Sequence, residues 1–128
     1  MKTNMKKIIL SFIIPVFIMA CGGGNSKGTS PSNGTDNTKN PDYQKGLELV
    51  SKNDCFTCHK IDEPLTGPPY REVANKYAGM PDTIVTHLAH KIISGGTGNW
   101  GSIVMTPHAG VSEQDAEAMV KYILLLKK

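Results

Sequence analysis

The stretch Cys55-Phe56-Thr57-Cys58-His59 decides how the rest of this 128-residue chain is interpreted. Two thiols stand three positions apart, and a histidine directly follows the second thiol. Cysteine and histidine side chains at this spacing are typical of metal centres, redox-active dithiols and covalently attached cofactors. A small domain gains stability from a covalent staple or a cofactor, so the motif bears on the fold as well as on the function.

The Cys-x-x-Cys-His spacing matches the attachment sequence of c-type haem. Two thiols three positions apart can add across the two vinyl groups of one porphyrin. The histidine that follows is then placed beneath the iron as an axial ligand. The sequence therefore predicts one haem c, bound covalently through Cys55 and Cys58, with His59 as a metal ligand.

Three other interpretations use the same residues. A structural zinc site needs a fourth ligand at a suitable spacing. A thioredoxin-like dithiol needs a strand–helix–strand setting, which the sequence pattern lacks. A plain disulfide between Cys55 and Cys58 is the third. Haem attachment is favoured because five positions match and because the chain begins with features of an exported protein.

Residues 1–20 have the pattern of an export signal. Lys2, Lys6 and Lys7 precede an apolar run of 13 residues, 8–20. A membrane-spanning helix needs about 20 apolar residues, whereas the apolar region of a signal peptide needs about 7–15. We therefore expect a signal peptide, with a short uncleaved membrane anchor as the alternative.

The end of this run, Ile18-Met19-Ala20-Cys21-Gly22, resembles a bacterial lipoprotein lipobox. The resemblance implies that Cys21 is lipidated and anchors the protein to a membrane, where each buried methylene contributes about 0.8 kcal/mol. Ordinary cleavage near Ala20, which leaves a free thiol, is the alternative. Residues 21–40 then form a flexible tether, because they carry no large apolar side chain that would offset the entropy of ordering them.

Residues 41–128 are predicted to form an all-α domain of four helices with no convincing strand. Apolar residues recur at helical spacing in four stretches. The four faces are Tyr43, Gly46, Leu47 and Val50; Tyr70, Val73, Ala74, Tyr77 and Ala78; Ile84, Val85, Leu88, Ala89, Ile92 and Ile93; and Ala116, Met119, Val120, Ile123 and Leu124. Asn40, Asp82 and Ser112 are expected to cap three of these helices, and Gly95-Gly96 to end the third.

The sixth ligand of a haem iron has to come from outside the motif. The candidates are Met80, Met105, Met119, His87, His90 and His108. On a helix over 82–94, His87 and His90 face away from the apolar stripe, so we expect both to face water. Met119 lies on the apolar face of the last helix and is expected to be a core residue.

Three candidates remain. Met80 is only 21 residues from His59 and opens a turn. Met105 lies in the irregular, glycine-rich stretch 95–111, which can cross the open face of a haem. Its rival is His108, three residues further on.

The order of the motifs resembles that of the short bacterial class I monohaem cytochromes c, over residues 42–127. The matching motifs are Cys55-Phe56-Thr57-Cys58-His59, Leu65-Thr66-Gly67-Pro68-Pro69-Tyr70, Asn99-Trp100-Gly101, Met105-Thr106-Pro107-His108 and a C-terminal amphipathic helix. The resemblance implies the class I cytochrome c fold, with about four helices wrapped around one covalently attached haem. It also implies that Gly46 lets the first and last helices cross closely.

The resemblance assigns roles at the cofactor. Cys55 and Cys58 would carry the thioether bonds, His59 would be the proximal iron ligand and Met105 the distal one. The Pro68 carbonyl would accept a hydrogen bond from the other nitrogen of the ligand histidine.

The resemblance also places the Trp100 indole at the haem edge, where it can donate to a propionate; a generic core aromatic is the alternative. The chain departs from the family at Thr106 and His108, where many relatives have Pro and Asn. Ligation by His108, or a switch between it and Met105, therefore stays open.

The function implied is one-electron transfer between respiratory-chain components by a protein that is not an enzyme and has no small-molecule substrate. Expected partners are the membrane, a quinol-oxidising complex and a terminal oxidase or reductase, with the haem domain in the periplasm or another extracytoplasmic space. One alternative is a haem enzyme or gas- or peroxide-reactive cytochrome in which Met105 is displaceable. Another is a fixed electron-entry subunit of a larger oxidoreductase.

The charge of the chain argues against nucleic-acid binding. The 14 basic and 11 acidic residues give a formal charge of +3, which is no strong basic footprint. Lys2, Lys6 and Lys7 belong to the expected signal peptide, so 11 basic and 11 acidic residues remain after it. We therefore expect docking to partners with modest salt dependence.

Overall fold

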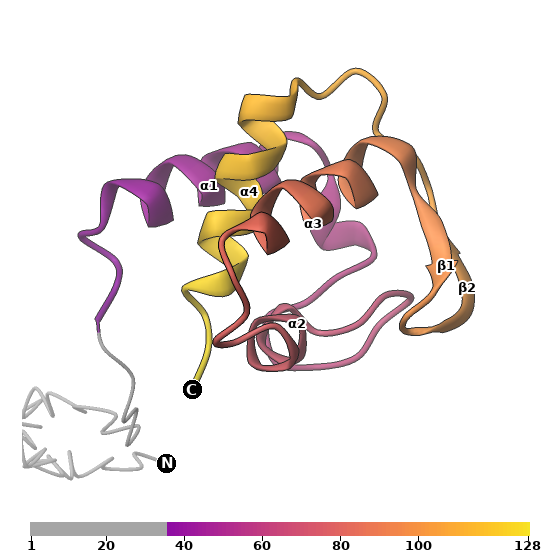
Figure 1. Cartoon of the computed structure of the whole chain (residues 1–128), viewed down its shortest axis with the longest axis horizontal. Helices are drawn as coiled ribbons and strands as arrows, with labels where there is room; N and C mark the ends of the chain where they lie inside the picture. Colours follow the sequence, from indigo (N-terminus) through magenta and orange to yellow (C-terminus); the bar gives the residue numbers. More distant parts are fainter. Residues whose placement is uncertain (1–35) are drawn as a thin grey trace, which may run out of the picture. The chain divides into compact units, whose positions relative to one another are not determined.

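The computed structural model describes residues 36–128, which contain four α-helices and one small sheet (Figure 1). The helices are α1 (Pro41–Lys52), α2 (Tyr70–Lys76), α3 (Thr83–Ser94) and α4 (Glu113–Leu124), and a short 3₁₀ turn, η1, covers Cys55–Thr57. The four helices expected from apolar periodicity are confirmed.

The expectation of no strand was wrong. Strands β1 (Gly96–Gly98) and β2 (Gly101–Met105) form an antiparallel hairpin in which Gly96 pairs with Met105 and Gly98 with Gly101. Glycine occupies three of the eight strand positions, so no alternation of apolar and polar side chains marks the strands in the sequence.

Helix α4 is the centre of the domain, because α1, α2 and α3 all pack against it. The side chains of Val50, Met119, Val120 and Tyr122 are almost completely buried in this core. The small residues Ala74, Ala89 and Ala116 are also buried, and they let the helices approach one another. The apolar faces predicted for α1 and α4 therefore meet in one hydrophobic core.

The crossing of α1 and α4 depends on a glycine (Figure 1). A Cβ atom built on Gly46 would lie 2.3 Å from the Cβ of Tyr122 and 2.4 Å from the carbonyl oxygen of Ala118. Such distances do not occur between non-bonded atoms, so only glycine fits at this position. The expectation that Gly46 allows a close crossing is confirmed.

Two of the three expected helix caps are present. The side chain of Asn40 accepts a hydrogen bond from the backbone N–H of Asp42, and that of Ser112 accepts one from Asp115. The cap expected at Asp82 was wrong. Its backbone is already helical (φ −57°, ψ −22°), and its side chain makes no capping bond, whereas a capping residue has an extended backbone.

The residues just before α1 contact the domain. The Asn37 side-chain amide donates to the carbonyl of Leu125 at 2.8 Å, and Gln44 donates to the carbonyl of Thr38 at 3.1 Å. No helix within residues 36–128 is long and apolar enough to cross a membrane. The expected signal peptide, residues 1–20, and the expected lipidation site, Cys21, lie outside the described residues.

We predict that Gly46→Ala destabilises the protein. Alanine improves helix propensity by about 1 kcal/mol, but forcing an extra methyl group into a packed core costs about 1–3 kcal/mol or more. Because the clash is with the backbone of α4, we expect a net loss of about 2 kcal/mol in the free energy of unfolding, measured by urea denaturation.

Gly110→Ala is the matched control, because a Cβ at Gly110 meets nothing within 4 Å. It should change the free energy of unfolding by less than about 0.5 kcal/mol. Equal stability of the two variants would contradict the close-crossing argument.

Candidate haem site

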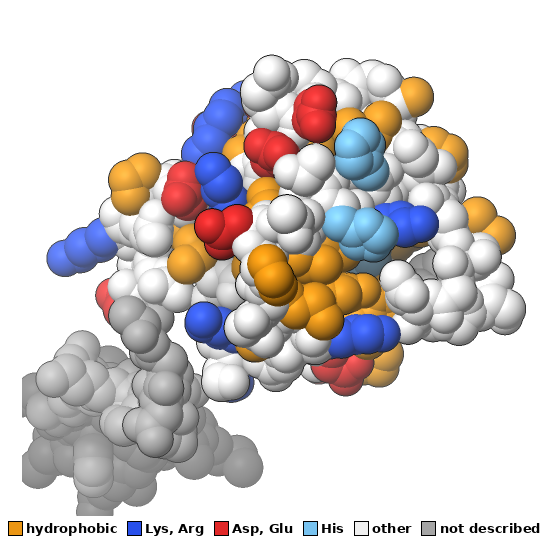
Figure 2. Space-filling view, viewed as in Figure 1, with side chains coloured by type: hydrophobic (Ala, Val, Ile, Leu, Met, Phe, Trp, Pro, Cys, Tyr) orange, Lys and Arg blue, Asp and Glu red, His pale blue; other side chains and the backbone are white. Residues whose placement is uncertain are grey.

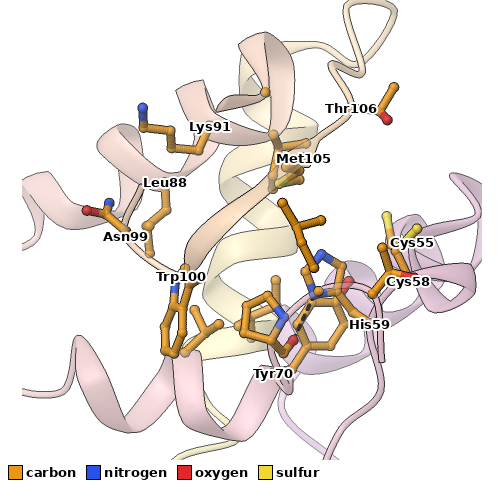
Figure 3. Close-up of a pocket in the computed structure, with 18 of the residues that line it drawn as sticks. Cys55, Cys58, His59, Tyr70, Leu88, Lys91, Asn99, Trp100, Met105 and Thr106 are labelled. Carbon is orange, nitrogen blue, oxygen red and sulfur yellow. Dashed lines mark hydrogen bonds between the residues drawn. The ribbon is translucent and has the colours of Figure 1, made fainter. Parts of the chain in front are cut away.

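A cavity of about 640 Å³ opens between the η1 segment, α2, the hairpin and α4 (Figure 3). Its volume lies within the range of small-molecule and cofactor sites. All six residues expected to bind the cofactor line it: Cys55, Cys58, His59, Pro68, Trp100 and Met105. The structure thus brings together residues that lie up to 50 positions apart in the sequence.

The His59 ring is oriented by a hydrogen bond to the backbone. Its Nδ1 atom lies 2.8 Å from the carbonyl oxygen of Pro68. A carbonyl oxygen can only accept a hydrogen bond, so Nδ1 carries the proton in this contact. The lone pair of the neutral ring is then on Nε2, which leaves that atom as the one able to bind a metal.

Two neighbours confine the same ring. A Cβ atom on Gly67 would lie 2.4 Å from Cε1 of His59, so glycine is required beside the imidazole. The buried ring of Tyr70 stacks on the His59 imidazole. Their centroids are 5.0 Å apart and their planes are inclined by 14°. The sequence places Tyr70 on a helix face and at the end of the motif that contains Pro68, but assigns it no role at the cofactor; its position two residues after Pro68 is the signal that could have identified one.

The two thiols are presented by the short η1 turn. The backbone N–H groups of Cys58 and His59 both donate to the carbonyl of Cys55, at 3.2 and 3.0 Å, which folds the motif into one tight turn. Figure 3 shows the two sulfur atoms beside each other. Burial raises the pKa of the Cys55 thiol.

None of the three other interpretations of this motif gains support from residues 36–128. The two thiols are not joined by a disulfide. Within residues 36–128, no group of three or more His, Cys, Asp or Glu side chains is arranged to hold a metal ion. The segment around the thiols is a 3₁₀ turn followed by loop, not the strand–helix–strand unit of a thioredoxin-like dithiol.

The six candidates for a second iron ligand separate by position. Met105, His108 and Met119 line the cavity, and Met80, His87 and His90 do not. The side chains of His87 and His90 are exposed, as the helical geometry predicted. Met80 is half exposed in the loop between α2 and α3. Met119 is completely buried in the helical core, as expected.

Met105 stands at the end of β2 and is partly buried. A Cβ on Gly95 would lie 2.4 Å from the Met105 carbonyl oxygen, so the end of the strand can close against the end of α3 only because residue 95 is glycine. His108 is also partly buried, and its backbone N–H donates to the carbonyl of Ile92 at 3.0 Å.

The domain is mostly helical, and one cofactor-sized cavity carries a Cys-x-x-Cys-His turn, an oriented histidine and a methionine. These features define a small c-type haem protein. The family model for cytochrome c matches residues 43–127, and the chain belongs to the cytochrome c family.

Relatives of known identity agree with this assignment. The chain is 42% identical over 84 residues to cytochrome c-552 of Nitrosomonas europaea, an alignment that covers 66% of this chain and 81% of the relative. It is 44% identical to cytochrome c-551 of Azotobacter vinelandii, covering 66% of this chain and all of the relative.

Solved structures of relatives share the fold. The crystal structure of N. europaea cytochrome c552 superposes with a TM-score of 0.60 at 42% identity, covering 63% of this chain and 99% of that one. The class 1 cytochrome MtoD of Sideroxydans lithotrophicus gives 0.55 at 30% identity, covering 65% and 94%.

Three expectations are thereby confirmed: the class I cytochrome c fold, one haem c bound covalently through Cys55 and Cys58, and a role in electron transfer rather than catalysis. The residues present fit the cofactor. The cavity carries two adjacent thiols and an imidazole whose Nδ1–H donates a hydrogen bond to the Pro68 carbonyl.

We predict that Gly67→Ala displaces the His59 imidazole, because the new methyl group would overlap the ring. The free energy of unfolding should fall by about 1–3 kcal/mol. The Nδ1–H resonance of His59 in ¹⁵N-labelled protein should shift and exchange faster with solvent, as its bond to Pro68 weakens.

Gly110→Ala again serves as control and should leave this resonance unchanged. An unshifted His59 resonance in Gly67→Ala would show that the ring does not depend on the glycine.

Proposed function

We propose that the protein is a one-electron carrier between respiratory-chain components, with His59 Nε2 and Met105 Sδ as the two axial ligands of its haem iron. The observation that carries the proposal is the hydrogen bond between Nδ1 of His59 and the Pro68 carbonyl, which leaves Nε2 unprotonated. The lining of the same cavity by Met105 supports the second ligand.

When bound, the haem supplies an Fe(III)/Fe(II) couple. His59 and Met105 would both bind its iron, which would leave the metal no free position for a substrate. The neutral thioether of Met105 favours the reduced state and raises the reduction potential relative to two histidine ligands. The mainly apolar wall of the cavity, which includes Val73, Leu88 and Ile123, acts in the same direction by excluding water.

The proposed partners are a quinol-oxidising complex and a terminal oxidase or reductase. Basic and acidic side chains are interspersed on the face in Figure 2, with no large patch of one sign. The chain after residue 20 is formally neutral. Encounter with partners should therefore depend only modestly on ionic strength.

We predict that Met105→Ala lowers the reduction potential and admits exogenous ligands such as carbon monoxide. The fall should be on the order of 100 mV, within the range of about 0.8 V over which axial ligands set haem potentials. Potentiometry and the near-infrared sulfur-to-iron charge-transfer band of the oxidised protein are the measurements.

His108→Ala is the matched control, since His108 lines the same cavity and follows Met105 by three residues. It should keep both the potential and the band. The assignment of Met105 fails if its variant keeps the wild-type potential, or if the wild-type protein binds carbon monoxide readily.

The proposal includes export and a lipid anchor on Cys21. Its support is the sequence of residues 1–22 and the polar composition of the tether that follows. The anchor would let the haem domain move above an extracytoplasmic membrane surface while staying close to membrane complexes.

We predict that a labelled fatty acid is incorporated into the wild-type protein and lost in Cys21→Ser, while the covalent haem stain remains. Lipid attaches at this thiol alone, because Cys55 and Cys58 carry the haem. Incorporation of label into Cys21→Ser would refute the anchor.

A further inference from the structure

The β1–β2 hairpin delivers two residues of the site, Trp100 at its turn and Met105 at its end. No residue from 96 to 104 is buried against the helices, and Trp100, Ile103 and Val104 line the cofactor cavity, so packing on the helices does not hold the hairpin. At its base, Gly95 packs against the Met105 carbonyl. The turn is about five residues away from this base and needs a contact of its own.

That contact comes from Lys76, the last residue of α2. Its Nζ atom donates to the carbonyl oxygen of Asn99 at 2.8 Å and lies 4.3 Å from the centroid of the Trp100 ring. Within residues 36–128, no carboxylate forms an ion pair with Lys76. The ammonium group also lies 5.9 Å from the ring centroid of the adjacent Tyr77, so its two shorter contacts are those with the turn of the hairpin.

Both contacts need an ammonium or guanidinium group. The face of an indole attracts a cation because of the ring quadrupole, and the Asn99 carbonyl needs a donor. An apolar side chain of the same length could follow the lysine stem but would make neither contact.

The position of Lys76 at the end of α2 connects the hairpin to the side of the cavity that carries His59. At the other end of this short helix, Tyr70 stacks on His59. Helix α2 therefore touches the histidine wall of the cavity at its first residue and the hairpin wall at its last. Figure 3 shows Tyr70 and Trp100 on this cavity.

We propose that Lys76 is a positioning residue that fixes the turn of the hairpin to α2. It thereby holds Trp100 at the edge of the cavity and keeps Met105, at the end of β2, on the cavity wall. The inference rests on the proposed ligation by Met105. Release of Met105 from the iron requires the hairpin to move, and that movement breaks both Lys76 contacts.

Binding of imidazole to the oxidised holoprotein tests the proposal. Imidazole can reach the iron only in the fraction of molecules whose hairpin has opened, so its apparent affinity reports that fraction. Lys76→Met keeps the apolar stem and removes the charge and the donor. Loss of one cation–π contact and one hydrogen bond should tighten imidazole binding about tenfold. Lys76→Arg retains both contacts and should stay within about twofold of wild type.

Two further variants separate positioning from general effects. Lys52→Met also removes an exposed lysine with one hydrogen bond, but that bond is to Glu48 on α1. Asn40→Ala removes the side-chain cap of α1 and weakens the domain at a helix that packs against α4 rather than against the hairpin. Neither should change the affinity for imidazole.

The indole N–H resonance of Trp100 gives a second readout that does not depend on the iron ligand. It should shift in Lys76→Met and stay near its wild-type position in Lys76→Arg. Unchanged affinity and an unchanged indole resonance in Lys76→Met would each overturn the proposal, and so would equal tightening in Lys52→Met or Asn40→Ala.

Failure of the proposed function gives a different result. If the wild-type protein lacks the sulfur-to-iron charge-transfer band, Met105 is not the ligand. The expected effect of Lys76→Met on imidazole binding then disappears as well. The shift of the Trp100 indole resonance in Lys76→Met would still test the contact between Lys76 and Trp100.

Discussion

The hydrogen bond from His59 Nδ1 to the Pro68 carbonyl is the contact on which the site depends. It sets the tautomer of the imidazole and the direction of Nε2, and it joins the attachment turn to the start of α2. Backbone bonds reinforce the junction: Gly67 N–H donates to the Cys58 carbonyl at 2.7 Å, and Tyr70 N–H to that of Lys60 at 2.9 Å. A ligand held by its own backbone in this way needs little reorganisation when the charge of the iron changes.

The second constraint is the close approach of other atoms to the backbone, which glycine allows at three places. Gly46 allows α1 to cross α4, Gly67 gives room to the His59 ring, and Gly95 lets the end of β2 close on α3. In each case an added Cβ would lie within 2.4 Å of another atom. Gly46 and Gly67 act through the volume that a side chain would occupy. Gly95 acts through volume and also through its φ of +68°, a conformation that other residues rarely adopt.

The sequence predicted the features that depend on local spacing. Helices α1 and α4 follow from apolar periodicity, and the attachment turn follows from five consecutive residues, because both signals lie within a few turns of chain. Contacts between distant residues were missed. The position of Tyr70 two residues after Pro68 is a sequence signal for its place beside His59. Nothing around Lys76 indicates its contact with Trp100, because that contact exists only after α2 has packed. The hairpin was missed because its glycines carry no pattern.

The dependence of both cavity walls on α2 raises the question of what holds α2 itself. A helix of seven residues is unstable alone, so its position must come from packing. Ala74 is completely buried against the core. Arg71 donates to the carbonyl of Leu126 beyond the end of α4 and also pairs with Asp62, and Asn75 accepts from the backbone of Lys128. The C-terminal residues of the chain therefore fix α2, and α2 in turn positions the histidine on one side and the hairpin on the other.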